Sequence, residues 1–323
     1  MIPFDESQLS QSQSLRLYTT LKAGGDAELF TIARTSEELA SACAWAQART
    51  IPHTILGWGS NMLPSDAGVP GLVVLNKAAE LTISEGGEVE VDTGISFQDL
   101  FLQTVQAGLR GLEFAVGIPG TLGGALVSNA GAYRSNVSEF LTELEVVRDG
   151  VRAWVSPEVM QFSYRDSILR SANPPQMAVT RVRMKLPSGD WKAAYDEARD
   201  YQRQRIGKQP PSASAGSFFK NINDQALADS LPNLPERLRS AGVVPAGYLI
   251  ENCGLKGFRH EGAMIGARHA NFLLNVGNAR ASALRRLAEY ASAQVKSQYG
   301  VGLEEEVLYL GDWSAWESTG RLT

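Results

Sequence analysis

Two periodicities in the pattern of hydrophobic and polar residues separate helical from extended segments of the chain. Apolar residues recur three or four positions apart over 35–49, where Thr35 and Glu38 form a capping box. The same spacing predicts helices over 96–109, 190–205 and 282–300, each preceded by a capping Ser or Asp or ended by Gly or a basic residue. The pattern therefore predicts four long helices spread along the chain.

Other segments alternate with a period of two, as strands do. A hairpin is predicted over 81–93, turning at 85–88, and another over 144–155, turning at 148–150. Apolar and basic residues alternate over 182–186, which predicts a strand with one buried face. Short apolar runs predict further strands at 54–56, 71–76 and 270–276. Hairpins mixed with helices indicate an α+β fold and not a doubly wound parallel sheet.

Composition narrows the class of protein. The 323 residues suffice for two or three domains, and 44% hydrophobic with 20% charged residues is typical of a soluble globular protein. A net charge of −5 without a basic stripe argues against nucleic-acid binding. The sequence has no run of about 18 apolar residues, so it predicts no membrane-spanning helix. The polar N-terminus lacks the apolar core of a secretion signal. We therefore expect a cytoplasmic protein.

The stretch from Gly111 to Tyr133, GLEFAVGIPGTLGGALVSNAGAY, holds six of the glycines. So much Gly, with one Pro, argues against an ordinary helix or strand and for backbone that approaches a ligand closely. Successive N–H groups of small residues form concave sites suited to phosphate oxygens. The alternative is a set of tight turns without a ligand.

A second Gly-rich loop, GWGSN at 57–61, follows the strand predicted at 54–56. It does not fit the G-x-G-x-x-G fingerprint of a Rossmann dinucleotide site, because Gly57 and Gly59 are followed by Ser60, Asn61 and then Pro64. Ser and Asn are nevertheless small polar donors suited to a phosphate or ribose.

Taken in order, several motifs resemble one family. They are GWGSN (57–61), GIPGTLGGALVSNAGAY (117–133), FSYRDS (162–167), SAGSFFKN (214–221), GLKG (254–257) and LEEEV (303–307). Together they resemble the UDP-N-acetylenolpyruvoylglucosamine reductases, the flavoenzymes that complete UDP-N-acetylmuramate for peptidoglycan. No tyrosine-bearing loop stands between Leu186 and Pro210, which resembles the branch of the family without that loop.

The resemblance implies an α+β FAD-binding fold like that of vanillyl-alcohol oxidase, followed by a substrate-binding domain. The implied boundaries are 1–78 and 79–203 for two FAD-binding subdomains, with the C-terminal strand 304–323 joining the second, and 204–303 for the substrate domain. It also implies non-covalent FAD, reduced by NADPH as co-substrate. The implied FAD-binding residues are Gly57, Gly59, Ser60, Asn61, Ile118, Gly120, Thr121, Gly123, Gly124, Asn129, Gly131 and Ala132.

The chemistry of the implied reaction needs specific groups. Reducing an enolpyruvyl ether takes a hydride at the terminal carbon and a proton at the carbon bearing the ether oxygen, while negative charge builds up on the carboxylate side. By resemblance Ser217 is the proton donor, and Arg165 holds the carboxylate as a guanidinium can. Glu306 matches the catalytic glutamate, but Glu305 stands where the family usually has Pro, so either Glu304 or Glu306 could face the site.

The sugar nucleotide also needs binding groups. Tyr133 is expected beside the flavin and substrate, and the candidates for the diphosphate are Arg205, Lys208, Lys220 and Asn221, with a solvated helix end as the alternative for Arg205. The three histidines lack ligand spacing, so no metal site is predicted. We expect a monomer that binds a UDP-sugar and NADPH, with no nucleic-acid or membrane partner.

Three other functions fit parts of the sequence. Ser217 and Lys220 form an S-x-x-K motif, as in penicillin-recognising hydrolases, but neither S-D-N nor K-T-G occurs. A flavin-dependent oxidase could share the fold, using oxygen in place of NADPH. A non-catalytic flavin or nucleotide carrier would leave Arg165, Ser217 and Glu306 without a role.

Overall fold

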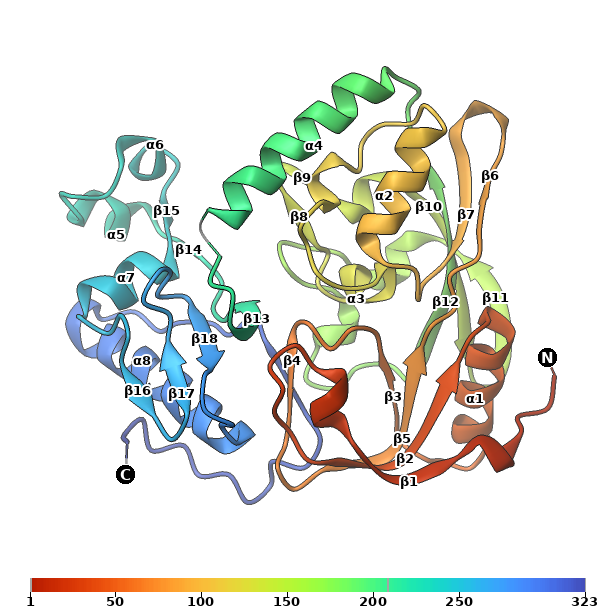
Figure 1. Cartoon of the computed structure of the whole chain (residues 1–323), viewed down its shortest axis with the longest axis horizontal. Coiled ribbons are helices and arrows are strands. Elements are labelled where there is room, and N and C mark those ends of the chain that lie inside the picture. Colours follow the sequence, from red (N-terminus) through yellow and green to blue (C-terminus); the bar gives the residue numbers. More distant parts are fainter. Residues whose placement is uncertain (1, 208, 323) are drawn as a thin grey trace. The chain divides into compact units, whose positions relative to one another are not determined.

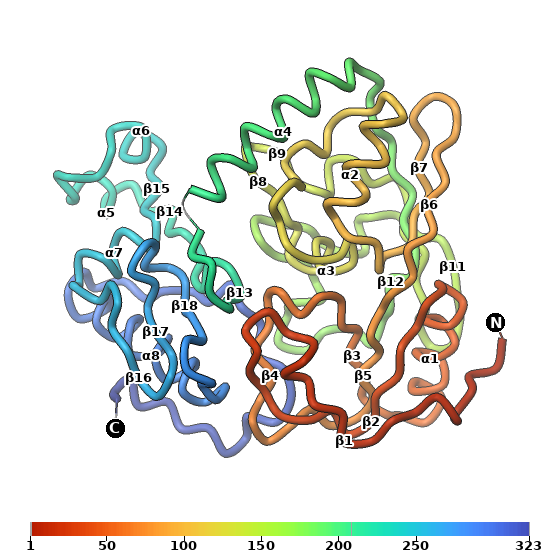
Figure 2. Tube along the Cα trace, viewed as in Figure 1, coloured from red at the N-terminus to blue at the C-terminus, as the bar shows by residue number. Residues whose placement is uncertain are grey.

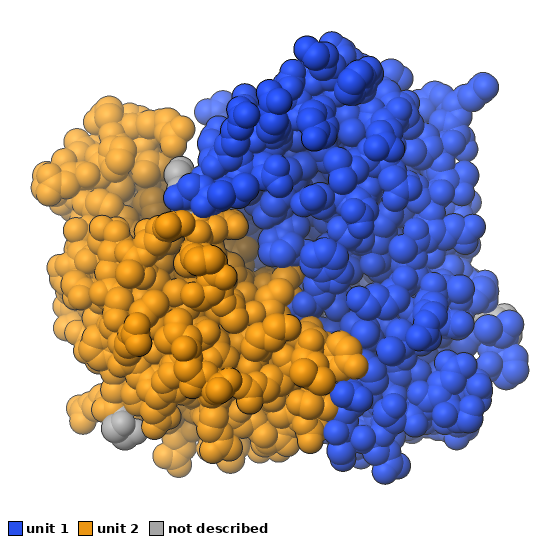
Figure 3. Space-filling model, viewed as in Figure 1, with its two compact units in different colours: residues 1–13, 27–59, 69–207 blue, residues 14–26, 60–68, 208–323 orange. Residues whose placement is uncertain are grey.

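The computed structural model describes residues 2–207 and 209–322. Contacts divide the chain into two compact units (Figure 3). Unit 1 contains residues 1–13, 27–59 and 69–207, and unit 2 contains 14–26, 60–68 and 208–323. Each unit is therefore assembled from separate segments of the chain.

Unit 1 contains a four-stranded sheet in the order β1-β2-β5-β3, formed by β1 (Ser10–Ser14), β2 (Asp26–Ala33), β5 (Val69–Asn76) and β3 (His53–Leu56). Strands β2 and β3 both run parallel to β5. Helix α1 (Ser36–Ala48) begins after Thr35, whose side chain accepts a hydrogen bond from the Glu38 amide, so the predicted cap and helix are confirmed. The buried face of α1, including Cys43, packs on residues of β5, β10 and β12.

The second sheet of unit 1 has the order β11-β10-β12-β7-β6. Its strands are β6 (Leu81–Ile83), β7 (Glu88–Asp92), β10 (Leu141–Arg148), β11 (Val151–Val155) and β12 (Met177–Lys185). All the pairings are antiparallel, and β6-β7 and β10-β11 are the two hairpins that the alternation predicts. This sheet and the parallel one together confirm the α+β class.

Helices α2 (Phe97–Gln106), α3 (Leu122–Val127) and α4 (Trp191–Ile206) complete unit 1, with the short strands β8 (Gly131–Ala132) and β9 (Ser135–Asn136) (Figure 1). The Ser96 side chain caps α2 as predicted. Short 3-10 turns lie at Glu6–Gln8, Leu15–Tyr18, Glu85–Gly87, Glu113–Ala115, Val137–Phe140, Pro157–Met160 and Ile168–Arg170. Helix α3 shows that the Gly-rich stretch is not wholly irregular, because Thr121 caps a turn that continues through apolar residues.

Unit 2 is built on the sheet β13-β18-β17-β16, formed by β13 (Ala213–Ser217), β18 (Phe272–Asn275), β17 (Ala263–Ile265) and β16 (Arg259–His260). Helix α8 (Ala281–Tyr299) packs its apolar face on this sheet, and α7 (Ala246–Asn252) packs beside it. The prediction that Ser282 caps α8 is wrong, because the helix begins at Ala281 and no side chain of its own segment caps it. The carboxylate of Asp66 accepts from the amides of Ala281 and Ser282 at 2.9 and 2.8 Å.

The polar segment 222–244 leaves this sheet and returns to it. Strand β14 (Ile222–Asn223) pairs antiparallel with β15 (Val243–Val244), and α5 (Gln225–Ser230) and α6 (Glu236–Arg239) lie between them. Figure 2 traces this excursion along the chain. It is therefore a closed loop whose two ends are paired.

The C-terminal segment differs from its predicted place. Strand β19 (Leu308–Leu310) pairs in parallel with β4 (Met62–Pro64) inside unit 2, and not with the sheet of 79–203. The pairing brings together strands more than two hundred residues apart, which local pattern does not reveal. The division into three domains stays a prediction.

Candidate functional site

The Gly57 loop touches the start of α3. A Cβ at Gly57 would overlap Thr121 Oγ1 and come within 3.1 Å of its Cγ2. Gly59 and Gly120 have φ of +58° and +140°. The value at Gly120 is one that almost no residue other than glycine adopts. Only glycine allows this approach, so the two Gly-rich segments that the sequence links to FAD lie against each other in unit 1.

The amides after Thr121 are already used within the protein. Leu122 N donates to Ile95 O at 2.9 Å, Gly123 N to Thr93 O at 2.7 Å and Gly124 N to Thr121 Oγ1 at 3.3 Å. The sequence suggested that such N–H groups point at phosphate. These three instead fix the position of the stretch.

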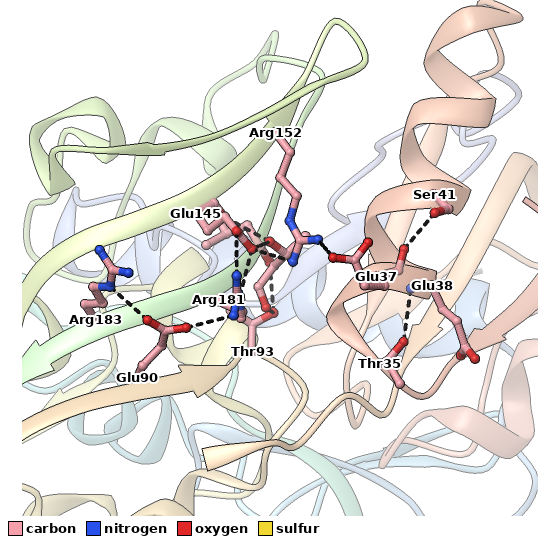
Figure 4. A network of polar contacts seen from close by, with 12 residues as sticks. Thr35, Glu37, Glu38, Ser41, Glu90, Thr93, Glu145, Arg152, Arg181 and Arg183 are labelled. Carbon is pink, nitrogen blue, oxygen red and sulfur yellow. Dashed lines mark hydrogen bonds and ion pairs between the residues drawn. The ribbon is translucent and has the colours of Figure 1, made fainter. Parts of the chain in front are cut away.

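Thr93 connects this stretch to the antiparallel sheet. Its hydroxyl donates to Val179 O at 2.8 Å and accepts from Asn76 Nδ2 at 3.0 Å, and its own amide donates to Thr180 O. The Thr180 hydroxyl in turn donates to Glu145 Oε2 at 2.8 Å. These contacts connect the sheet to the Gly-rich stretch through Thr93, and Figure 4 shows the part of the network around Thr93, Glu145 and Arg181.

Glu145 is the centre of the network. Arg181 Nη2 and Arg152 Nη2 each lie 2.8 Å from its carboxylate, which is 5% exposed. Although burial opposes it, these hydrogen bonds lower the pKa of Glu145 to about 2. Arg152, on β11, also pairs with Glu37 of α1, so the network connects the antiparallel sheet to helix α1 (Figure 4).

Arg165 lies beside the end of the Gly-rich stretch. Its guanidinium donates to Gly131 O, and its backbone has φ of +56°. Asn129, also left-handed at φ +41°, donates from its side chain to Ser163 O at 3.1 Å. A positive φ is unusual outside Gly, so the structure holds both turns in a costly conformation, as functional sites often do.

Tyr133 stacks on an aromatic residue that the sequence analysis did not single out. Its ring lies 3.6 Å from that of Tyr201 at an interplanar angle of 7°. The Arg205 guanidinium lies 5.7 Å from the Tyr133 ring and donates to Phe114 O. Burial lowers the pKa of Arg205, and the positive charge of Arg165 lowers it further. Arg205 is therefore half-buried among site residues and not a solvated helix end.

A pocket of about 450 Å³ opens beside this stack, within unit 1. Its walls include Arg110, Glu113, Phe114, Tyr133, Glu197 and Tyr201. Its charges are paired among themselves, since Arg110 lies 3.0 Å from Glu113 and 2.7 Å from Glu197. Of the predicted residues that the structure describes, Ala132 and Tyr133 line this pocket.

In unit 2 the segment 217–220 is held on both sides by backbone pairing. On one side the amide side chain of Asn271, which is 3% exposed, pairs with the backbone of Phe219 as a neighbouring strand would. Its Oδ1 accepts from Phe219 N at 3.0 Å, and its Nδ2 donates to Phe219 O at 2.8 Å. On the other side Lys220 N donates to Glu304 O and Glu306 N to Phe218 O, both at 2.8 Å. The segment with Ser217 and Lys220 is thus paired with the segment of Glu306, which lies far from it in sequence.

Ser217 ends β13 at an irregularity in its pairing with β18. Gly216, at φ +77°, makes the bend that directs Ser217, and no atom lies within 4 Å of where its Cβ would stand. Within the described part of the chain the Ser217 hydroxyl has no hydrogen-bond partner.

The three consecutive acids have different surroundings. Glu304 lies 2.6 Å from Lys220 Nζ and is exposed, whereas Lys220 is 8% exposed. Glu305 accepts a hydrogen bond from Tyr309 at 2.6 Å, and burial raises the pKa of Glu305. Glu306 is half-buried, and its carbonyl accepts from Asn61 Nδ2 at 3.1 Å. Glu304 is paired with Lys220, and the choice between Glu304 and Glu306 stays a prediction.

Several predicted residues are left without a tested role. Asn221 is exposed, and Lys208 lies outside the described residues. Arg165, Tyr133 and Arg205 belong to unit 1, while Ser217, Lys220 and Glu306 belong to unit 2. Within 2–207 and 209–322 no helix is long and apolar enough to cross a bilayer, and no cluster of three His, Cys, Asp or Glu side chains could hold a metal ion.

Family models, related sequences and a solved structure all show similarity to the same family. Residues 27–151 match the FAD binding domain family, and 208–310 match the C-terminal domain of UDP-N-acetylenolpyruvoylglucosamine reductase. The reductase of that name from Synechococcus sp. (strain JA-3-3Ab) is 38% identical over 91% of this chain and 89% of its own length. That from Acaryochloris marina is 38% identical over 92% of this chain and 91% of its own. The crystal structure of the Thermus caldophilus reductase is 33% identical in sequence and superposes with a TM-score of 0.72. The match covers 94% of this chain and 98% of the Thermus chain.

Proposed function

The chain belongs to the UDP-N-acetylenolpyruvoylglucosamine reductase family, and from this premise we propose which residues carry out the family's reaction. The reaction is the NADPH-dependent, FAD-mediated reduction of UDP-N-acetylglucosamine enolpyruvate to UDP-N-acetylmuramate for peptidoglycan. The protein is thus a flavin-dependent oxidoreductase. The further assignments below are proposals.

The residues of unit 1 fit FAD. The approach of Gly57 to Thr121 leaves no room for a side chain, as a cradle around a diphosphate requires. No carboxylate occurs in 57–61 or 117–124, so the phosphates would meet no like charge there. We assign these two segments, with Asn129, Gly131 and Ala132, to holding the cofactor. Ser60 and Asn61 continue the loop into unit 2.

Bound FAD supplies the hydride for the carbon–carbon double bond after NADPH has reduced it, because no side chain can. What remains for the protein is to orient the enolpyruvyl group, to stabilise negative charge on its carboxylate side and to deliver one proton. The three proposed catalytic residues divide these tasks.

Arg165 is proposed to hold the substrate carboxylate. A guanidinium presents paired donors to a carboxylate and keeps its charge at any working pH. The hydrogen bond to Gly131 O and the left-handed backbone fix where the side chain starts. The neighbouring charge of Arg205, of the same sign, makes an incoming anion more favourable at this place.

Ser217 is proposed to deliver the proton. A serine hydroxyl is a weak acid, so a nearby cation must stabilise the alkoxide that it leaves. Lys220 supplies such a charge three residues along the chain, nearly buried, with Glu304 as its counter-ion. Apart from its two chain neighbours, no atom lies within 4 Å of where a Cβ on Gly216, the residue before Ser217, would stand.

Glu306 is proposed as the catalytic glutamate that assists proton placement. Its backbone is held to Phe218 O, one residue from Ser217, and its carbonyl to Asn61. This pairing between 218–220 and 304–306 is the observation that carries the proposal. The family's chemistry asks for a serine and a glutamate together, and the fold brings these two segments to adjacent positions.

The sugar nucleotide is assigned to Tyr133, Arg205, Lys220 and Asn221, with Lys208 proposed from sequence alone. Tyr133 and Arg205 stand together in unit 1, where the ring and the guanidinium can take a base and a phosphate. The resemblance also supports the proposal that 204–303 form the substrate domain.

The hydrolase alternative has no support beyond Ser217 and Lys220. Such hydrolases also need S-D-N and K-T-G motifs, and neither occurs in the sequence. An oxidase remains the competing flavoenzyme. We also propose that the protein acts as a monomer in the cytoplasm, which sedimentation and cell fractionation test.

Rapid mixing under argon tests the function in two steps. NADPH is expected to bleach the bound flavin, and the enolpyruvyl sugar nucleotide is then expected to restore the oxidised spectrum. Restoration by oxygen but not by that substrate would favour the oxidase and contradict the proposal.

A further inference from the structure

A half-buried carboxylate that the proposed reaction does not use lies next to Glu306. Tyr309 donates its hydroxyl hydrogen to Glu305 at 2.6 Å, and burial raises the pKa of both side chains. The carboxylate faces the positive Arg285 and the negative Glu289. Glu305 is therefore packed against other residues of unit 2, whereas Glu304 is exposed.

The residues that follow are fastened to helix α8. The Arg285 guanidinium lies 4.4 Å from the ring of Tyr309, 4.6 Å from Trp313 and 4.9 Å from Trp316. Trp316 Nε1 also donates to Glu289 Oε1 at 2.6 Å, and that oxygen lies 3.6 Å from Arg285 Nε. One arginine thus stacks with three rings from the C-terminal segment.

The backbone around Glu305 is the part that meets the proton donor's segment. Glu305 forms a bridge with Phe219, and the amides of Lys220 and Glu306 complete the pairing on either side. Any shift of Glu305 therefore moves Glu306 relative to Ser217. Displacements of about 1 Å at a reacting centre can cost about 100-fold in rate.

We propose that Glu305, Tyr309 and Arg285 form a clamp that positions the segment 304–306, and with it Glu306, against Ser217. The clamp rests on the proposed function, since Glu306 and Ser217 are assigned to the reduction there. Glu305 is a positioning residue and touches no reacting atom.

Glu305→Ala and Tyr309→Phe, alone and combined, test the clamp on the FAD-loaded full chain. Each is expected to slow reoxidation of reduced flavin by the enolpyruvyl sugar nucleotide at least about tenfold, while reduction by NADPH changes less than about twofold. Because the two act as one unit, the double variant should be no slower than the slower single variant. Tyr290→Phe, on α8 and stacked on Phe258, is the matched control and should leave both steps unchanged.

Equal slowing of both steps, or losses that multiply in the double variant, would overturn the clamp. If Glu305→Ala does not fold, Glu305→Gln replaces it: the glutamine oxygen still accepts from Tyr309, so this variant should keep the rate that Tyr309→Phe loses. Equal rates for the two variants would also overturn the clamp. A wild-type protein that is not reoxidised by the substrate would instead refute the proposed function, which keeps the two failures distinct.

Discussion

Gly57→Ala tests whether contact between the two Gly-rich segments holds the cofactor. The new methyl group would overlap Thr121 Oγ1, so the loop 57–61 or the start of α3 must move. Overpacking of this kind costs about 1–3 kcal/mol. If that strain falls on the FAD-bound arrangement, affinity drops about 5- to 150-fold, since about 1.4 kcal/mol is a factor of ten.

The same geometry predicts a rescue. Thr121→Ala removes the two nearest of the three atoms that the methyl group would meet and leaves only Cβ, 3.3 Å away, at the cost of a helix cap, about 1 kcal/mol. Gly57→Ala combined with Thr121→Ala should therefore bind FAD more tightly than Gly57→Ala alone. Gly207→Ala is the control, because Gly207 has helical φ and ψ and no contact closer than 3.6 Å.

FAD affinity is measured by titrating the apoprotein and following the quenching of flavin fluorescence, with the melting temperature as a check on folding. Unchanged affinity of Gly57→Ala, or a double variant that binds no better than the single one, would refute the contact as the reason for glycine at this position.

Three further predictions concern other residues. Ser217→Ala should leave flavin reduction by NADPH nearly intact and slow substrate reduction at least about 100-fold; equal losses would mean that Ser217 is structural. Arg205→Gln should raise the KM for the sugar nucleotide more than it lowers kcat, and the reverse would contradict a binding role. Glu145 has a folded pKa of about 2 against 4.5 unperturbed, worth about 3 kcal/mol of stability above pH 5 that is lost as the pH falls towards 2. Unfolding free energy measured against pH should flatten over that range in Glu145→Gln, and an unchanged slope would be evidence against the network.

Local pattern predicted much of the secondary structure. The helices at 36–48 and 97–106 and both hairpins follow from periodicity and from caps that lie within three residues of the helix start. The cap of α8 could not be predicted in this way, because Asp66 lies 215 residues from the amide that it accepts from. The same holds for the pairing of β19 with β4.

The candidate site was predictable only by resemblance. Composition and spacing suggested a phosphate cradle, but the amides of 122–124 are bonded within the protein and the fold uses close backbone approach instead. Asn271 and Tyr201 carried no signal, since an asparagine just before a strand and a tyrosine in a helix are common. The apolar run 270–276 holds two amides, Asn271 and Asn275, and nothing in the sequence distinguishes them.

The most direct test follows NADPH oxidation under argon with the FAD-loaded protein, with and without the enolpyruvyl sugar nucleotide. We predict sustained oxidation only when that substrate is present, with one product molecule, heavier by two hydrogens, formed for each NADPH consumed. NADPH oxidation that does not depend on the substrate, or that proceeds only when oxygen is admitted, would contradict the assignment.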